Sequence, residues 1–157
     1  MIIGFTGTQK GMTQYQKDML LKVIELKKGT EFCTGDCIGS DKESVDIAFD
    51  FGIRVFTLFP LTDAKKRGWV FNEGRIYNND NGQWYTITYK GEAIQVRWMP
   101  RKPYLERNKD LVDYVAWMIA TPKEFKHSIR SGTWQTIRYS WKKKKDITII
   151  EPIVRED

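Results

Sequence analysis

Short apolar runs alternate with amphipathic helical patterns along most of this chain, and this alternation restricts the fold more than any other feature of the sequence. Residues 2–6 read IIGFT, an apolar run that ends at a glycine-containing turn, as a buried strand does. A helix pattern follows, in which Thr13 and Gln16 form a T-x-x-Q capping box and apolar residues recur on one face until Gly29. Strands and helices in alternation predict right-handed crossovers and a parallel sheet with helices on both faces.

The same alternation continues toward the C-terminus. We expect a strand at 31–34, a helix that begins with a Ser40–Glu43 capping box and ends at Gly52, and a strand at 53–59. Further along we expect a helix at 105–114, a strand at 115–120, a helix at 133–144 and a strand at 146–151. The predicted fold class is therefore α/β: a Rossmann-like, doubly wound, mostly parallel sheet in a single domain spanning 1–157.

One stretch interrupts this pattern with antiparallel signals. The turn sequence NDNG at 79–82 precedes two segments of alternating hydrophobicity, and the turn sequence KGE at 90–92 separates them. The alternating residues are Tyr85, Ile87, Tyr89, Ile94, Val96 and Trp98. We expect an inserted β-hairpin or meander at about 68–100. It is either a cover for the sheet edge, or a lid or dimer arm beside the rim where such sheets bind ligands.

Three loops on that predicted rim share one composition. They read TGTQKGMT at 6–13, TGDCIGSD at 34–41 and SGTW at 131–134. Each combines glycines, which let a ligand approach the backbone, with hydroxyl donors and a helix N-terminus that favours negative charge. Each is also an ordinary turn with a helix cap when taken alone. Together they predict a site for a phosphate and a ribose.

Composition narrows the class of protein. The chain has 157 residues, 26 Lys and Arg against 20 Asp and Glu, and a formal net charge of +6, which weakly favours an anionic ligand. It has no apolar run long enough to span a membrane, and MIIGFTG lacks the features of a signal peptide, so we expect a cytoplasmic protein without membrane contact. Cys33 and Cys37 stand without a second cysteine pair, which favours reduced thiols over a metal or redox site. We expect no metal and no bound cofactor.

The segments GFTGTQKGMT, FCTGDCIGSDKESVDIAFDFGIRVFTLFP, PYLERNKDLVDYVAWMIATP and RSGTWQTIRYSWKKKKDITIIEP together resemble the SLOG superfamily. This is the Rossmann-like core shared by DNA-processing protein A and the Lonely Guy phosphoribohydrolases. The resemblance covers nearly all of the chain except about 62–100, and it is closer to the DNA-processing protein. That protein has a Ser-Gly-x-Ala-x-Gly-Ile-Asp loop where this chain has residues 34–41, an Arg-Asn-Arg segment at 107–109, and a Ser-Gly-Ser-leading helix at 131–133. The chain is also similar to compact standalone SLOG proteins of bacteria and phages.

The resemblance implies nucleotide chemistry, but one departure matters. Lonely Guy enzymes cleave the N-glycosidic bond of a nucleoside monophosphate with a Gly-Gly-x-Gly-Thr loop that a glutamate follows. Here Gly132 and Thr133 are followed by Trp-Gln-Thr-Ile, without a carboxylate. Since glycosidic cleavage needs an acid or a charge-stabilising carboxylate, another residue would have to serve, and the candidates are Asp36, Asp41 and Glu106. Asp36 is placed to accept hydrogen bonds from ribose hydroxyls, whereas Asp41 is equally well a first-turn acid that stabilises the helix dipole.

Arginine and asparagine supply the remaining candidates. Arg107 presents a fork of donors suited to phosphate, and Asn108 beside it can hold the loop or a base edge. The structural alternative pairs Arg107 with Glu106 or Asp110. The predicted ligand-binding residues are Gly7, Thr8, Gln9, Gly35, Asp36, Gly39, Ser40, Asp41, Arg107, Asn108, Arg130, Ser131, Gly132 and Thr133.

Three functions follow from this pattern. The leading hypothesis is a sensor or sequestering module for a nucleotide, dinucleotide or NAD-derived ligand, which by family analogy suits a phage protein. The second is a nucleotide N-glycosidase. The third is single-stranded DNA binding, as in DNA-processing protein A, with stacking candidates Trp69, Trp84, Tyr85 and Trp98. Related cores often self-associate, so the resemblance also implies a homo-oligomer.

Overall fold

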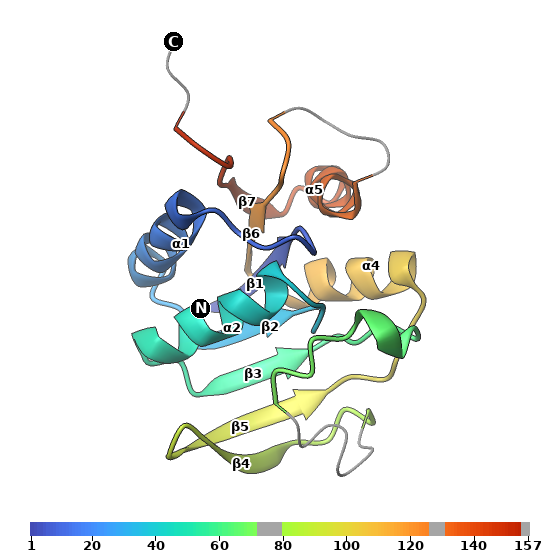
Figure 1. Ribbon diagram of the computed structural model, residues 1–157. Coiled ribbons are helices and arrows are strands. Elements are labelled where there is room, and N and C mark those ends of the chain that lie inside the picture. The colour runs from blue at the N-terminus through green and yellow to red at the C-terminus, as the bar shows by residue number, and fades with distance from the viewer. Residues whose placement is uncertain (72–79, 126–130, 155–157) are drawn as a thin grey trace.

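The computed structural model describes residues 1–71, 80–125 and 131–154. In these residues, seven strands form one sheet in the order β4-β5-β3-β2-β1-β6-β7 (Figure 1). The strands are β1 (Ile2–Gly7), β2 (Glu31–Thr34), β3 (Val55–Leu58), β4 (Tyr85–Tyr89), β5 (Glu92–Trp98), β6 (Trp117–Thr121) and β7 (Asp146–Ile149). Every neighbouring pair is parallel except β4 and β5. The predicted Rossmann-like α/β fold with an antiparallel hairpin is confirmed.

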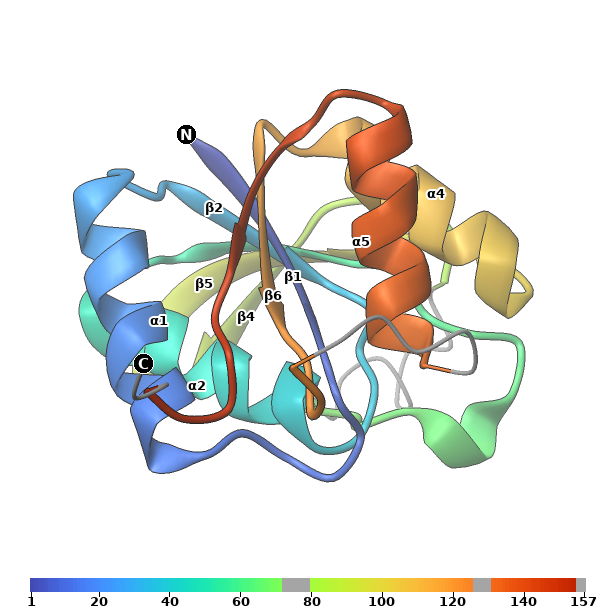
Figure 2. The ribbon, with the colours of Figure 1, turned by 90° about the horizontal axis from the view of Figure 1, so that it is seen from above.

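Helices cover both faces of the sheet. They are α1 (Gln14–Leu26), α2 (Ser40–Phe51), α4 (Tyr104–Tyr114) and α5 (Gly132–Lys142), with a short 3-10 helix η1 (Ala64–Lys66) after β3. Viewed from above, α1 and α2 lie on one face and α4 and α5 on the other (Figure 2). Alternate side chains of each strand therefore pack against different helices, which explains why the inner strands are apolar on both sides.

The strand order reverses direction at β1. From β1 the chain proceeds outward through β2 and β3 to the β4–β5 hairpin, and then returns to place β6 on the other side of β1. Gly7 is paired in register with Thr121 where β1 and β6 end. Such a reversal leaves a crevice at the carboxyl ends of the two strands, which is where open α/β sheets bind ligands.

The two predicted capping boxes have different outcomes. At α1 the Thr13 side chain accepts from the Gln16 amide at 3.1 Å and the Gln16 side chain accepts from the Thr13 amide at 3.0 Å, which confirms the box. At α2 the prediction is wrong: Gly39 is the N-cap, and Ser40 already belongs to the helix. The Ser40 hydroxyl donates to the Thr8 carbonyl at 2.6 Å, and Glu43 accepts from the Met12 amide at 2.7 Å. Both side chains hold the β1–α1 loop instead of capping α2.

The predicted insertion extends the sheet. β5 pairs parallel with β3, and a two-residue turn at Lys90 and Gly91 returns the chain to form the antiparallel pair with β4. Ile87, Ile94, Val96 and Trp98 are buried in the core on the α2 side. The described hairpin therefore continues the sheet and forms one of its edges. Residues 72–79 of the insertion lie outside the described part.

Gln16 is buried at 1% exposure and joins three segments, and from this we predict a large effect of its removal. Its Nε2 donates to the carbonyls of Pro122 and Ile150 at 2.8 and 3.0 Å, in addition to the capping box. Gln16→Ala leaves two buried carbonyls and one amide without their partner, so we expect the free energy of unfolding to fall by about 2–4 kcal/mol. Urea unfolding followed by circular dichroism measures it.

The matched control is Gln14→Ala in the same helix. Gln14 is exposed and bonds only Asp18 on the helix surface at 2.9 Å. We expect a change within about 0.5 kcal/mol. Equal losses for the two variants would contradict the role assigned to Gln16.

Candidate functional site

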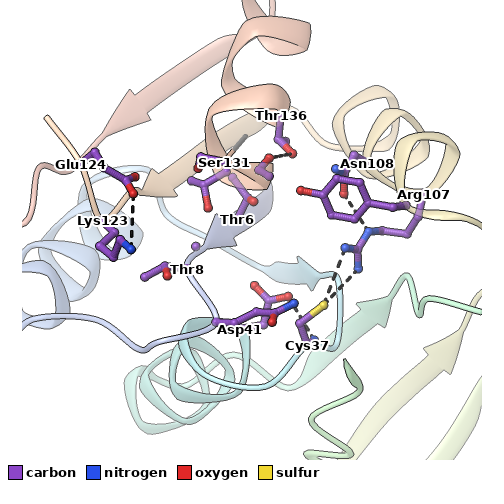
Figure 3. A pocket seen from close by; sticks show the side chains of 15 residues that line it. Thr6, Thr8, Cys37, Asp41, Arg107, Asn108, Lys123, Glu124, Ser131 and Thr136 are labelled. Carbon is purple, nitrogen blue, oxygen red and sulfur yellow. Dashed lines mark hydrogen bonds and ion pairs between the residues drawn. The ribbon is translucent and has the colours of Figure 1, made fainter. Parts of the chain in front are cut away.

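A cavity of about 340 Å³ opens at the carboxyl edge of the sheet, beside the ends of β1 and β6 (Figure 3). Its lining comes from the β1–α1 loop, the β2–α2 loop, α4, the segment after β6, and the first turns of α5. The lining residues are Thr6, Gly7, Thr8, Gln9, Cys37, Asp41, Tyr104, Arg107, Asn108, Lys123, Glu124, Ser131, Gly132, Thr133 and Thr136. The cavity therefore occupies the crevice created by the reversal of strand order.

Nine of the predicted ligand-binding residues line this cavity. They are Gly7, Thr8, Gln9, Asp41, Arg107, Asn108, Ser131, Gly132 and Thr133. Arg130 lies outside the described residues. The other four, Gly35, Asp36, Gly39 and Ser40, are absent from the lining, and each has a structural role.

Gly35 and Gly39 are required by close packing within the protein. A Cβ at position 35 would overlap the Arg107 guanidinium, and a Cβ at position 39 would overlap the backbone carbonyl of Gln9. Gly39 also has a φ of +80°, in the left-handed region that favours glycine. The space that we expected a ligand to use at these two positions is filled by protein atoms.

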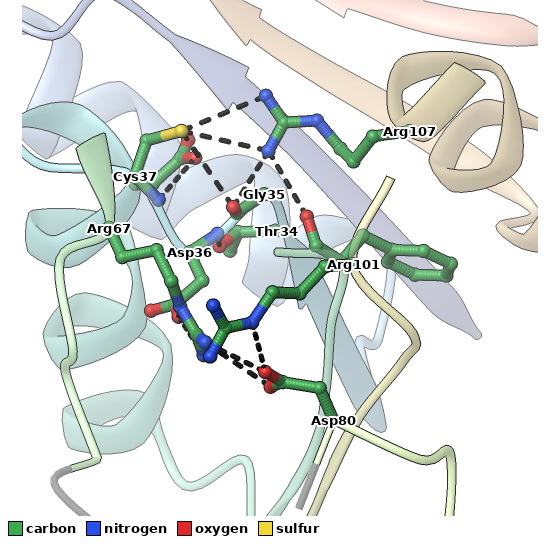
Figure 4. A network of polar contacts seen from close by, with 10 residues as sticks. Thr34, Gly35, Asp36, Cys37, Arg67, Asp80, Arg101 and Arg107 are labelled. Atoms are coloured by element: carbon green, nitrogen blue, oxygen red, sulfur yellow. Dashed lines mark hydrogen bonds and ion pairs between the residues drawn. The ribbon is translucent and has the colours of Figure 1, made fainter. Parts of the chain in front are cut away.

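Asp36 does not face the cavity as predicted, because its carboxylate is part of a buried ionic network (Figure 4). Its Oδ2 lies 3.0 Å from Nε and 2.9 Å from Nη2 of Arg67, and both side chains are buried. Arg67 also contacts Asp80, to which Arg101 donates at 2.5 Å. Burial raises the pKa of the Asp36 carboxyl to about 6, against the opposing effect of Arg67. The network anchors the segment after η1 to the β2–α2 loop.

Asp41 is the carboxylate of this loop that reaches the cavity. It is 5% exposed, and its Oδ2 accepts from the Cys37 amide at 3.1 Å. Burial raises the pKa of Asp41 from 3.8 to about 7, although the nearby Arg107 lowers it. Near neutral pH the group therefore populates both its acid and its carboxylate form.

Arg107 is buried and ties several elements together. Its Nη1 donates to the carbonyls of Gly35 at 2.7 Å and Phe59 at 3.1 Å, and its Nε donates to Asn108 Oδ1 at 2.8 Å. The alternative in which Arg107 pairs with Glu106 or Asp110 is not seen among the described residues, where Asp110 pairs with Lys102. Two of its nitrogens are thus occupied by protein acceptors, and Nη2 contacts the Cys37 sulfur at 3.7 Å. Most of the Arg107 guanidinium is therefore held by protein atoms, and its main role is to form part of the cavity wall.

The first turn of α5 forms the opposite wall. Ser131 caps the helix by accepting from the Trp134 amide at 3.3 Å, and Thr136 donates to the Gly132 carbonyl at 3.0 Å. Gly132 packs against the Tyr104 hydroxyl so closely that a Cβ would overlap it. The amides of the first turn have no acceptor within the helix, so this end presents donors and a positive dipole.

Six lining residues were not among the predicted ligand-binding residues, although Thr6 and Cys37 belong to loops that the sequence placed at this rim; the other four are Tyr104, Lys123, Glu124 and Thr136. Lys123 and Glu124 come shortly after the end of β6, and Lys123 Nζ lies 3.6 Å from Glu124 Oε1. Their position after a predicted strand was the available signal, because every such loop reaches the same edge of a parallel sheet. Tyr104 and Thr136 carry no comparable signal, since each looks like an ordinary helical residue.

Two further candidates lie elsewhere. Glu106 is exposed and does not line the cavity, so the structure does not support its predicted catalytic role. Trp98 is 1% exposed in the core, so its prediction as a base-stacking residue is wrong. Trp69 packs against Arg67 and Trp84 against Arg97, both away from the cavity lining.

The cysteines are buried free thiols, as predicted. Burial raises the pKa of Cys37 to about 11, so the thiol in the cavity wall is protonated at neutral pH. Within residues 1–71, 80–125 and 131–154, no cluster of His, Cys, Asp and Glu is arranged to hold a metal. None of the helices in this part of the chain is long and apolar enough to cross a membrane.

Comparison with known proteins gives a relationship of fold only. No family model and no curated protein sequence matches this chain. A similar solved structure is described as the molybdenum cofactor binding protein from the phototrophic bacterium Rippkaea orientalis. The TM-score is 0.60, with 15% sequence identity, over 96% of this chain and 76% of that one. The two proteins share the Rossmann-like α/β architecture.

The raised pKa of Asp41 predicts how stability depends on pH. Between about pH 4, where the unfolded carboxyl titrates, and pH 7 the folded state binds more protons than the unfolded state. Asp41 therefore makes the protein less stable as the pH rises through this window. The groups that set its pKa include Arg107 from α4 and Cys37 and Asp36 from the β2–α2 loop.

Asp41→Asn should remove this contribution. We expect the variant to gain on the order of 2 kcal/mol relative to the wild type between pH 4.5 and pH 8, as measured by urea unfolding at several pH values. Glu106→Gln, an exposed change in α4, is the control and should follow the wild-type curve. Parallel wild-type and Asp41→Asn curves would contradict the assignment.

Proposed function

We propose that this chain binds a nucleotide or nucleotide-derived anion in the cavity between β1 and β6 and holds it without cleaving it. One observation carries the proposal: the α5 N-terminus, the β1–α1 loop and Lys123 converge on a polar cavity at the point of strand reversal. A sensor or sequestering module needs this geometry and no catalytic group.

The phosphate is best accommodated at the α5 side of the cavity. The first-turn amides of Gly132 and Thr133 point out of the helix N-terminus, where the dipole favours an anion. The Lys123 side chain is half exposed at the cavity and supplies a mobile ammonium. Backbone donors and one lysine together match a phosphate group.

The remaining walls suit a polar sugar. Thr6, Thr8 and Asn108 offer hydroxyl and amide groups, and Asp41 can accept from a hydroxyl or, when protonated, donate to one. A partly neutral Asp41 also repels an incoming anion less than a full carboxylate would. The volume is at the lower end of the range for ligand pockets, which favours a ligand of mononucleotide size over a polymer.

The sequence resemblance supports a nucleotide ligand, and the structural comparison supports the shared fold and a ligand-binding role. Membership of the SLOG superfamily, and the phage role that family analogy suggests, are part of this proposal. The similar solved structure is described as a molybdenum cofactor binding protein. The four stacking candidates do not favour single-stranded DNA, since Trp98 is buried, Tyr85 packs against the core, and Trp69 and Trp84 already stack on arginines.

A second function, N-glycosidic cleavage, is favoured by Asp41 alone. A buried carboxyl whose pKa is raised to about 7 is the type of group that protonates a leaving base. On the α5 side, Thr136 lines the cavity near the position where the related enzymes carry glutamate, and its hydroxyl is bonded to Gly132. An Asp41 acid would therefore act without a carboxylate from that helix.

The binding proposal predicts a specific loss on removal of Lys123. Lys123→Ala should weaken the binding of a nucleoside monophosphate about tenfold, because it removes one charge-assisted contact to phosphate. Isothermal titration calorimetry with a panel of nucleotides measures it. Lys142→Ala, in the last turn of α5 and outside the cavity lining, is the matched control and should bind as the wild type does. Equal affinities for both variants would show that the phosphate lies elsewhere.

Incubation with the same panel distinguishes holding from cleaving. We expect intact nucleotide to be recovered after denaturation of the protein, as quantified by chromatography of the base and nucleotide fractions. Release of free base that Asp41→Asn abolishes would overturn the binding-only proposal in favour of the N-glycosidase. Release that persists in Asp41→Asn would reject Asp41 as the acid as well.

A further inference from the structure

Within residues 1–71, 80–125 and 131–154, the strand β4 forms one edge of the sheet, and its own sequence has none of the features that usually block an edge. Residues 84–89 read WYTITY, without a charged residue or proline. Within the described residues, β4 pairs only with β5. Exposed edges of this kind pair readily with another strand, and proteins normally prevent this with charges, prolines or very short strands.

The opposite edge of the same sheet shows these preventive features. β7 has four residues, begins at Asp146 and follows a run of lysines. Glu151 and Pro152 follow it closely. The two edges of the sheet therefore differ, because β7 carries features that discourage strand pairing and β4 lacks them.

The sequence of β4 is the same in both directions. It reads Tyr-Thr-Ile-Thr-Tyr from Tyr85 to Tyr89, with Ile87 at its centre. An antiparallel pair formed by two copies of this strand about a two-fold axis at Ile87 places Tyr85 opposite Tyr89, Thr86 opposite Thr88, and Ile87 opposite itself. Aromatic and threonine pairs of this kind stabilise antiparallel strands, and no like charges meet.

The backbone is oriented for this pairing. Lys90 and Gly91 have φ values of 48° and 81°, which is the two-residue turn that makes Tyr89 and Glu92 a hydrogen-bonded pair. Alternate residues of β4 therefore bond to β5, and Thr86 and Thr88 direct their N–H and C=O groups outward. Their side chains are exposed on the face opposite Ile87.

We infer that β4 is a self-association surface, at which the edge strands of two copies of this chain pair antiparallel around Ile87 and join their sheets. Each Thr86 then exchanges backbone hydrogen bonds with Thr88 of the second copy.

The expected association is weak and reversible. One five-residue strand pair buries less than the roughly 1,200 Å² typical of stable interfaces, so we expect a dissociation constant on the order of micromolar to tens of micromolar. The surface lies at the opposite end of the sheet order from the cavity, so the inference does not depend on the proposed ligand.

Charge substitutions at the two threonines test both the surface and its register. Thr86→Lys with Thr88→Lys places lysines opposite each other across the axis and should give a monomer at every concentration. Thr86→Lys with Thr88→Glu places each lysine opposite a glutamate of the second copy and should restore the dimer. Sedimentation velocity from about 1 µM to about 500 µM measures the monomer and dimer fractions.

The matched control is Ala93→Lys with Gln95→Lys. These residues are the partners of Thr88 and Thr86 in β5, so the same charge is added to the same face one strand inside the edge. The control should still dimerise at 0.15 M salt, and thermal unfolding should show that all variants fold. A wild-type chain that is monomeric at the highest concentration, a dimeric lysine pair, or a monomeric lysine–glutamate pair would each overturn the inference.

Discussion

The buried guanidinium of Arg107 is the interaction on which the cavity depends most. It reaches from α4 across the sheet edge to the carbonyls of Gly35 and Phe59, the first residues after β2 and β3. It also lowers the cost of keeping the Asp41 carboxylate in a buried wall. Without this side chain, the two backbone carbonyls would lose a hydrogen-bond donor and the Asp41 carboxylate would lose a nearby positive charge. α4 would also lose its link to the strands. The position of Gly35 follows from the same contact, because only a residue without a Cβ leaves room for the arginine.

A second arginine gives the β2–α2 loop its other fixed point. Asp36 has a φ of 53°, and this left-handed turn directs its carboxylate to Arg67, while Asp41 five residues later faces the cavity. Each acid of the loop therefore has its own arginine, one from the segment after η1 and one from α4. The Asp36–Arg67 ion pair is fully buried, so the free-energy cost of removing both charges from water is offset only if their geometry is good. Its main contribution is to fix the conformation of the loop. Asp80 of the insertion contacts Arg67, and Arg67 in turn holds Asp36 in the β2–α2 loop beside the cavity.

Local patterns in the sequence were sufficient for the architecture and for part of the site. Periodicity gave the alternation of strands and helices, and the Thr13–Gln16 box was readable because both partners lie within four residues. The Ser40–Glu43 pair has the same local pattern, yet both side chains bond the β1–α1 loop more than 30 residues away. Likewise, spacing alone does not distinguish Asp36 from Asp41, because the difference is a single backbone turn and an arginine supplied by a distant segment. Trp98 was misassigned for a related reason: β5 joins the parallel sheet at β3, a long-range pairing that converts an apparent rim aromatic into core.

The chemistry of the cavity depends on two features: α5 has no carboxylate in its first turn, and the β2–α2 loop supplies Asp41. A helix that begins Ser-Gly-Thr-Trp presents amides and hydroxyls to a ligand but no proton donor of suitable acidity. The carboxyl groups that line the cavity are Asp41 on the other wall and Glu124 beside Lys123. A phosphate at the helix N-terminus would therefore place a sugar, and not the phosphate, against Asp41, where a carboxyl that is half protonated near neutral pH suits hydroxyl recognition. To act as an acid, Asp41 would have to reach the glycosidic bond, so the orientation of the bound nucleotide relative to Asp41 decides between holding and cleaving.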